Sequence, residues 1–111
     1  MIVAIIPSAG KGERLKAKKP KQFLEIKGIP LFIYTLSKFE KHPEIEGIVI
    51  SVSPEYIKFT EKLVSSFGLK KILKIVKGGK TRQESVFYGV KASPPQTEIF
   101  LVHDAVRPFV S

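Results

Sequence analysis

The chain has 111 residues, a length that suits one compact domain, and 43% of them are hydrophobic, which argues against wholesale disorder. It contains no cysteine, so disulfides and thiolate metal sites are excluded, and no apolar run approaches the roughly 18 residues of a membrane helix. The net charge of +9 favours polyanionic partners such as nucleotides, phosphorylated metabolites or nucleic acid. The short apolar start has no basic stretch before it, which argues against a signal peptide, and we expect a cytoplasmic protein without a membrane partner.

Apolar runs alternate with helical patterns along the whole chain. In chain order, the patterns predict a buried strand over 2–6, a short strand over 23–26, a helix from Pro30 to about His42, a second buried strand over 48–52, a helix from Ser53 to Gly68, a strand over 72–76, a helix from about Thr81 to Ala92, and a buried strand over 99–102. Ser53 is expected to cap the second helix, with Phe67 on its apolar face, and Val86 and Val90 are expected to face the sheet. This alternation predicts an α/β fold with a doubly wound, mostly parallel sheet of the Rossmann-like type.

Ligands of such sheets bind beyond the carboxyl ends of the strands, and three segments lie there. The first, PSAGKGERLKAKKPKQF, places six basic residues and two glycines after the first strand. It is neither a Walker A loop nor a dinucleotide fingerprint, since Leu15 stands where the latter needs Gly or Ala. Glycines let a backbone approach phosphate closely, and Arg14 and Lys21 add a planar fork and a mobile charge, although the two glycines alone fit a plain turn equally well.

The second and third segments each have a functional and a structural interpretation. In GGKTRQES, the glycine pair frees backbone amides for a ligand, or Thr81 simply caps the following helix, and the residues alone favour the cap. In VHDAVRPF, Asp104 is the only aspartate of the chain and suits Mg²⁺ held against phosphates, or it is a buried carboxylate paired with Arg107. For His103, a packed histidine is favoured over a catalytic base, because no nucleophile stands nearby in the sequence.

Together, PSAGKGERL…PKQFLEI, GGKTRQESV and LVHDAVRPFV resemble the 2-C-methyl-D-erythritol 4-phosphate cytidylyltransferase family of isoprenoid precursor synthesis (the methylerythritol phosphate pathway), over essentially all of residues 1–111. The resemblance implies transfer of the cytidylyl group of CTP to a sugar-alcohol phosphate, with release of pyrophosphate and Mg²⁺ as cofactor. It assigns charge stabilisation at the reacting phosphate to Arg14 and Lys21, and metal binding to Asp104. The nucleotide-binding residues that it implies are Ser8, Ala9, Gly10, Lys11 and Gly12 around the triphosphate and Gly78, Gly79 and Ser85 at the nucleoside.

Members of this family are longer and form homodimers, so the resemblance implies that residues 1–111 are the N-terminal nucleotide-binding portion of the domain, with little activity alone. Val106 stands where the related ribitol-5-phosphate cytidylyltransferases often carry valine, which keeps that acceptor as the alternative. A basic nucleic-acid-binding module is the second alternative, but nucleic acid is not the expected partner. The chain has no nucleic-acid motif, and its basic cluster interleaves with glycine rather than with stacking aromatics.

Overall fold

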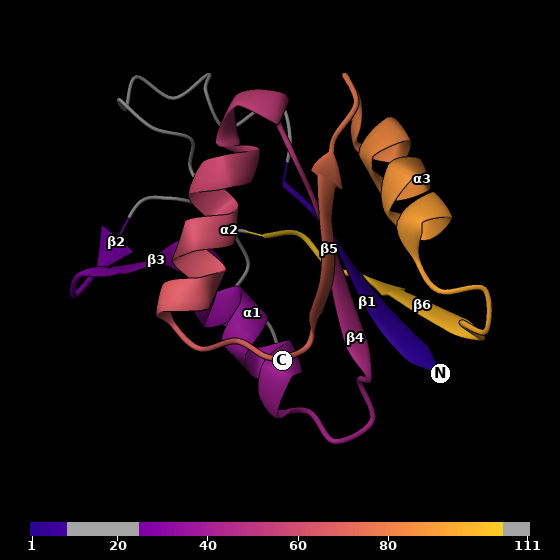
Figure 1. Ribbon diagram of the computed structural model, residues 1–111, viewed down its shortest axis with the longest axis horizontal. Helices are drawn as coiled ribbons and strands as arrows, with labels where there is room; N and C mark the ends of the chain where they lie inside the picture. The colour runs from indigo at the N-terminus through magenta and orange to yellow at the C-terminus, as the bar shows by residue number, and fades with distance from the viewer. Residues whose placement is uncertain (9–24, 106–111) are drawn as a thin grey trace.

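The computed structural model describes residues 1–8 and 25–105 (Figure 1). Its main sheet has four parallel strands in the order β5-β4-β1-β6: β1 (Ile2–Pro7), β4 (Gly47–Val52), β5 (Ile72–Lys77) and β6 (Ile99–Val102). A separate antiparallel hairpin joins β2 (Glu25–Ile26) to β3 (Ile29–Pro30). Its two turn residues, Lys27 and Gly28, both have positive φ angles, as a type I′ hairpin turn requires. The predicted α/β fold with a parallel sheet is confirmed.

Three helices cover the two faces of the main sheet. Helices α1 (Leu31–Lys41) and α2 (Ile57–Ser66) lie on one face, and α3 (Arg82–Ala92) lies on the other (Figure 1). All three predicted helices are therefore confirmed, with α2 preceded by a 3-10 turn over Pro54–Tyr56. Within the described residues, no helix combines the length and the apolar character that crossing a bilayer needs.

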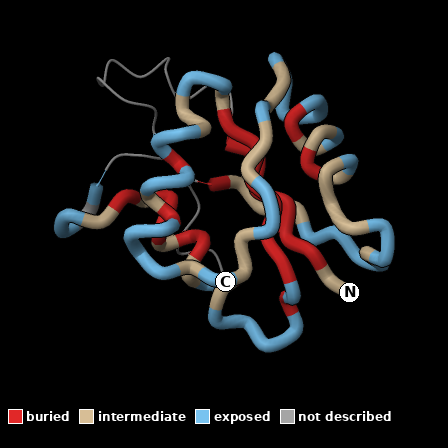
Figure 2. Tube along the Cα trace, in the orientation of Figure 1, coloured by how far each residue is buried: buried red, intermediate tan, exposed pale blue. Residues whose placement is uncertain are grey.

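The core consists of two apolar layers that share the central strands β1 and β4. On one face Ala4 and Ile6 pack with the buried side of α1, and on the other Val3 and Ile5 pack against Val86 and Val90 of α3. This alternation follows from the period of two residues in a strand. Figure 2 shows the resulting buried centre, in red, along β1 and β4. The prediction that the runs over 2–6 and 48–52 form buried strands is confirmed.

Three expectations fail at the edges of the fold. The run 99–102 was expected to be buried, but Ile99 is 54% exposed and Leu101 is 43% exposed. Strand side chains point to the faces of a sheet, and β6 lies at the edge of the described sheet, whereas α3 packs mainly over β1, β4 and β5. Phe67 was expected on the buried side of α2 and is 41% exposed, beyond the last helical residue. Ser53 does precede the 3-10 turn, but its side chain makes no capping hydrogen bond there.

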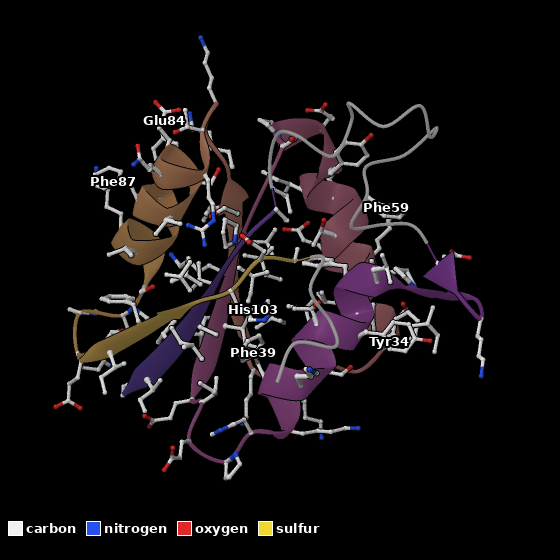
Figure 3. The ribbon with its side chains drawn as sticks, turned by 180° about the vertical axis from the view of Figure 1, so that it is seen from behind. Tyr34, Phe39, Phe59, Glu84, Phe87 and His103 are labelled. Carbon is white, nitrogen blue, oxygen red and sulfur yellow. The ribbon has the colours of Figure 1, made fainter. Side chains whose placement is uncertain are left out.

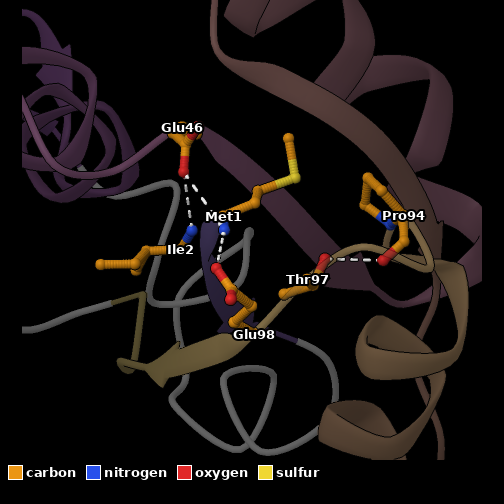
Figure 4. Close-up of polar contacts among 6 residues, drawn as sticks. All are labelled: Met1, Ile2, Glu46, Pro94, Thr97 and Glu98. Carbon is orange, nitrogen blue, oxygen red and sulfur yellow. Dashed lines mark hydrogen bonds and ion pairs between the residues drawn. The ribbon is translucent and has the colours of Figure 1, made fainter.

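The amino-terminal end of β1 is fixed between the segments that precede its two neighbours (Figure 4). The Met1 ammonium donates to Glu98 Oε1 at 2.7 Å and lies 3.6 Å from Glu46 Oε1, which also accepts from the Ile2 amide at 3.0 Å. The hydrogen bond to Glu98 raises the pKa of the ammonium, and the same contact lowers the pKa of the Glu98 carboxyl. These contacts hold the amino-terminal edge of the sheet, opposite to the edge where a ligand is expected.

Candidate nucleotide-binding site

Four strands deliver their following residues to one edge of the sheet, because all four are parallel. Ser8 follows β1, the pair Gly78-Gly79 follows β5, and His103 and Asp104 follow β6. The sequence prediction that these segments share the carboxyl edge is therefore confirmed. The predicted residues Ala9, Gly10, Lys11, Gly12, Arg14 and Lys21 lie outside the described residues, as do Val106 and Arg107.

Ser8 is buried and is bound to the end of β4. Its amide and its Oγ both donate to the carbonyl oxygen of Ser51, each at 2.8 Å. The Ser8 amide is thus already engaged in the sheet. What Ser8 contributes to the site is a fixed departure point for the chain that follows β1.

Two hydrogen bonds hold the turn Gly78-Gly79 against β4 and α3. The Gly78 amide donates to the Val52 carbonyl at 2.7 Å, and the Gly79 amide donates to Ser85 Oγ at 3.0 Å. Ser85 is 1% exposed, so the hydroxyl that accepts this hydrogen bond lies on the protein side of the turn, away from solvent. A Cβ on Gly79 would lie 2.3 Å from the Glu84 Cβ, a distance that no side chain tolerates. Glycine is therefore required at 79 for close packing of the turn against α3.

The first turn of α3 is closed by a reciprocal capping box. Thr81 Oγ1 accepts from the Glu84 amide at 3.1 Å, and Glu84 Oε1 accepts from the amides of Lys80 and Thr81 at 2.7 and 3.4 Å. The structural interpretation of Thr81 as a cap is confirmed. The sequence also contains the signal for the role of Glu84, because the spacing Thr-x-x-Glu at the start of a helix is the signature of a capping box, but that role was not predicted.

Asp104 makes an ion pair with Arg82 at the start of α3. Its Oδ1 accepts from Arg82 Nε at 2.9 Å, and its side chain is 30% exposed. The expected alternative partner, Arg107, lies outside the described residues. Because Arg82 begins α3 and Asp104 follows β6, this pair joins the second and third segments of the site. No local pattern in the sequence signals it, since the two residues are 22 positions apart.

His103 is packed, which confirms the prediction of a structural role for it. Its ring meets Phe39 of α1 edge to face, with centroids 5.3 Å apart (Figure 3). Its Nδ1 lies 2.8 Å from the Asp104 carbonyl oxygen, and its amide donates to the Ile5 carbonyl at 3.0 Å. Just beyond it, buried Thr35 donates its hydroxyl to the Ala105 carbonyl at 2.9 Å. The chain that leaves β6 is thereby fixed on α1, and Asp104 is carried on a well-anchored segment.

The donor set at this edge fits one way of holding Mg²⁺. In residues 1–8 and 25–105, no three His, Cys, Asp or Glu side chains gather into a protein-only metal cage. Asp104 offers a partly exposed carboxylate. Protein-bound Mg²⁺ commonly takes one or two carboxylates and completes its shell with water and substrate phosphates. The described residues therefore fit a metal that is bound together with a phosphorylated ligand.

Comparison with known proteins gives one consistent result. The family model described as IspD, 2-C-methyl-D-erythritol 4-phosphate cytidylyltransferase, matches residues 2–111. The protein of that name from Clostridium botulinum (strain Langeland) is 45% identical over 107 residues, which cover 96% of this chain and 47% of that protein. The one from Bacillus licheniformis is 41% identical over 106 residues, covering 96% and 46%.

Proteins of the same family are among the solved structures that match. The crystal structure of 4-diphosphocytidyl-2C-methyl-D-erythritol synthase from Anaerococcus prevotii matches with a TM-score of 0.82 at 33% identity, over 99% of this chain and 45% of that one. The Francisella tularensis 2-C-methyl-D-erythritol 4-phosphate cytidylyltransferase matches with a TM-score of 0.72 at 30% identity, over 99% and 46%. The chain thus spans about half the length of the relatives that it matches. On this evidence the chain belongs to the 2-C-methyl-D-erythritol 4-phosphate cytidylyltransferase family.

Proposed function

We propose that the protein transfers the cytidylyl group of CTP to 2-C-methyl-D-erythritol 4-phosphate. A phosphate oxygen of the acceptor forms a bond to the α-phosphorus of CTP, the bond from that phosphorus to the bridging oxygen breaks, and pyrophosphate leaves. The observation that carries the proposal is the family match over residues 2–111. The convergence of Ser8, the Gly78-Gly79 turn and Asp104 on one sheet edge supports it, because this edge is where α/β sheets bind nucleotides.

Catalysis in such a direct transfer rests on positioning and on stabilising charge. In the proposed division of roles, amides of Ala9 to Gly12 hold the triphosphate, and Arg14 and Lys21 neutralise charge that develops at the α-phosphate. The Gly78-Gly79 turn, with Ser85 beneath it, faces the nucleoside. Asp104 would hold Mg²⁺, which would neutralise phosphate charge when bound. The homodimer of the family is part of the same proposal, and light scattering on the purified protein tests it.

The test is pyrophosphate release from CTP in the presence of Mg²⁺, with two acceptors offered in parallel. Because residues 1–111 are expected to have little activity alone, we expect slow turnover with 2-C-methyl-D-erythritol 4-phosphate and none with ribitol 5-phosphate. Turnover with ribitol 5-phosphate alone would assign the related activity and overturn the acceptor. Calorimetric titration with CTP and Mg²⁺ is the companion measurement, because the nucleotide site is expected to bind CTP even where turnover is slow. Absence of CTP binding would refute the proposal as a whole.

A further inference from the structure

We infer that Ser51 is a positioning residue that ties two parts of the proposed nucleotide site to each other. Ser51 is the penultimate residue of β4 and is fully buried. Its backbone carbonyl accepts both hydrogen bonds from Ser8, and its side-chain Oγ donates to the Ser85 carbonyl at 2.7 Å. Ser51 therefore connects Ser8, the residue that follows β1, to the first turn of α3.

The connection continues to the glycine turn. Ser85 accepts the Gly79 amide on its own Oγ at 3.0 Å, while its carbonyl accepts from Ser51. Four residues thus form one continuous series of hydrogen bonds: Ser8, Ser51, Ser85 and Gly79. Ser8 and Gly79 belong to segments that follow different strands, and each is at the edge where the nucleotide is proposed to bind. A shift of Ser51 would move both.

The surroundings of Ser51 explain why its hydroxyl has to be bonded. The neighbouring positions of β4, Ile50 and Val52, are apolar and fully buried. A hydroxyl buried without a partner costs free energy, so a serine in such a strand is tolerated only because a partner lies within reach. Gly89 allows that reach, because a Cβ there would lie 3.3 Å from Ser51 Oγ and 2.8 Å from Ile5 Cγ2. The hydrogen bond of Ser51 thus depends on the close approach of α3 to β4, which Gly89 permits.

This inference rests on the proposed function, since the position of the turn matters through the nucleotide. Ser51→Ala removes the hydrogen bond to Ser85 and lets the first turn of α3 settle elsewhere. We expect CTP to bind the variant about tenfold more weakly, the effect of losing about one buried hydrogen bond. The KM for CTP is expected to rise accordingly, while the KM for the acceptor stays within about twofold, because the hydrogen bonds of Ser51 go to Ser8 and Ser85, which both belong to segments proposed to bind the nucleotide.

The matched control is Thr60→Val. Thr60 is also fully buried, but its Oγ1 has no hydrogen-bond partner among the described residues, so its loss removes a buried hydroxyl without breaking a link. Calorimetric titration with CTP and Mg²⁺ on the protein and both variants is done at a temperature where unfolding curves show each to be folded. Weaker binding by Ser51→Ala, with Thr60→Val equal to the parent protein, supports the inference.

Each other outcome has a distinct meaning. Equal CTP binding by Ser51→Ala and the parent protein would overturn the inference and leave the proposed function standing. No CTP binding by the parent protein would overturn both. If Ser51→Ala does not fold, Ser51→Cys serves instead, because the slightly larger thiol leaves no cavity and is only a weak donor. Weakened CTP binding by Ser51→Cys would support the positioning role, and unchanged binding would refute it.

Discussion

The contact between α3 and the sheet at Gly89 allows a sharp stability prediction. Gly89 is buried in the middle of the helix, where alanine would ordinarily be favoured by about 1 kcal/mol because it loses less backbone entropy. The added Cβ, however, would lie 2.8 Å from Ile5 Cγ2. Ile5 is fully buried in β1, between β4 and β6, so it has little freedom to move away.

The two effects oppose each other, and the packing term is the larger. Inserting a methyl group into a close-packed interior costs about 1–3 kcal/mol. After subtraction of the helix-propensity gain of about 1 kcal/mol, Gly89→Ala is expected to lower the free energy of unfolding by about 1 kcal/mol. The hydroxyl of Ser51, 3.3 Å from the same Cβ, adds to the crowding.

Urea denaturation followed by circular dichroism measures this change. Gln83→Ala is the control, since Gln83 is exposed on the same helix and its substitution tests propensity alone, with an expected change within about 0.5 kcal/mol. A Gly89→Ala protein that is as stable as its parent, or more stable, would refute the reasoning. It would mean that α3 can move off the sheet without cost and that the spacing between helix and strand is not fixed by this contact.

Four further outcomes follow from the contacts and the proposed roles. Thr81→Ala is expected to lower the free energy of unfolding by about 1 kcal/mol through loss of the cap, whereas Thr81→Ser keeps it; equal urea midpoints for both variants would contradict the capping role. Lys21→Ala is expected to lower kcat more than it weakens CTP binding, because its charge is needed most in the transition state, and a loss confined to binding would argue against that role. Lys41→Ala, at an exposed lysine that ends α1, is the control and is expected to change neither. Asp104→Asn is expected to raise the Mg²⁺ concentration for half-maximal turnover, and an unchanged Mg²⁺ titration would support a structural role for Asp104 instead. Finally, the raised pKa of the amino-terminal ammonium means that its contribution to stability is complete below its ordinary value of 8.0 and is lost as pH rises through the folded-state pKa. The lowered pKa of Glu98 means that its contribution is present above its ordinary value of 4.5 and is lost as pH falls, so Glu98→Gln should flatten the pH dependence of Tm at both ends, and an identical profile would count against the pair.

The sequence predicts the central part of the fold well because the relevant signals are local. The runs over 2–6 and 48–52 are apolar at every position or nearly so, which a strand covered on both faces requires, and they are the two inner strands. The run over 99–102 carries the same pattern and is exposed. Its burial depends on whether helices cover the faces of the sheet at its place in the strand order, and that order is a property of the whole chain that a four-residue pattern does not contain.

The same limit applies to the candidate site. The positions of Ser8, Gly79 and Asp104 at strand ends follow from chain order in a parallel sheet, so they could be predicted. The contact of Arg82 with Asp104 could not, because it requires that the start of α3 and the end of β6 lie side by side. The hydrogen bond from Ser51 to Ser85 could not be predicted either, because nothing in the apolar run 48–52 indicates a partner on α3.

The edge strand β6 also has a consequence for the colloidal behaviour of this chain. Among residues 1–8 and 25–105, β6 pairs with a strand on one side only, and such an edge presents open amides and carbonyls. Ile99, Phe100 and Leu101 add exposed apolar surface there, a combination that favours strand addition from another copy. The net charge of +9 opposes such contacts by mutual repulsion. That repulsion fades as added salt shortens the screening length from about 30 Å at 0.01 M to about 3 Å at 1 M. The solubility of this polypeptide is thus set by a balance that ionic strength tips toward edge-to-edge association.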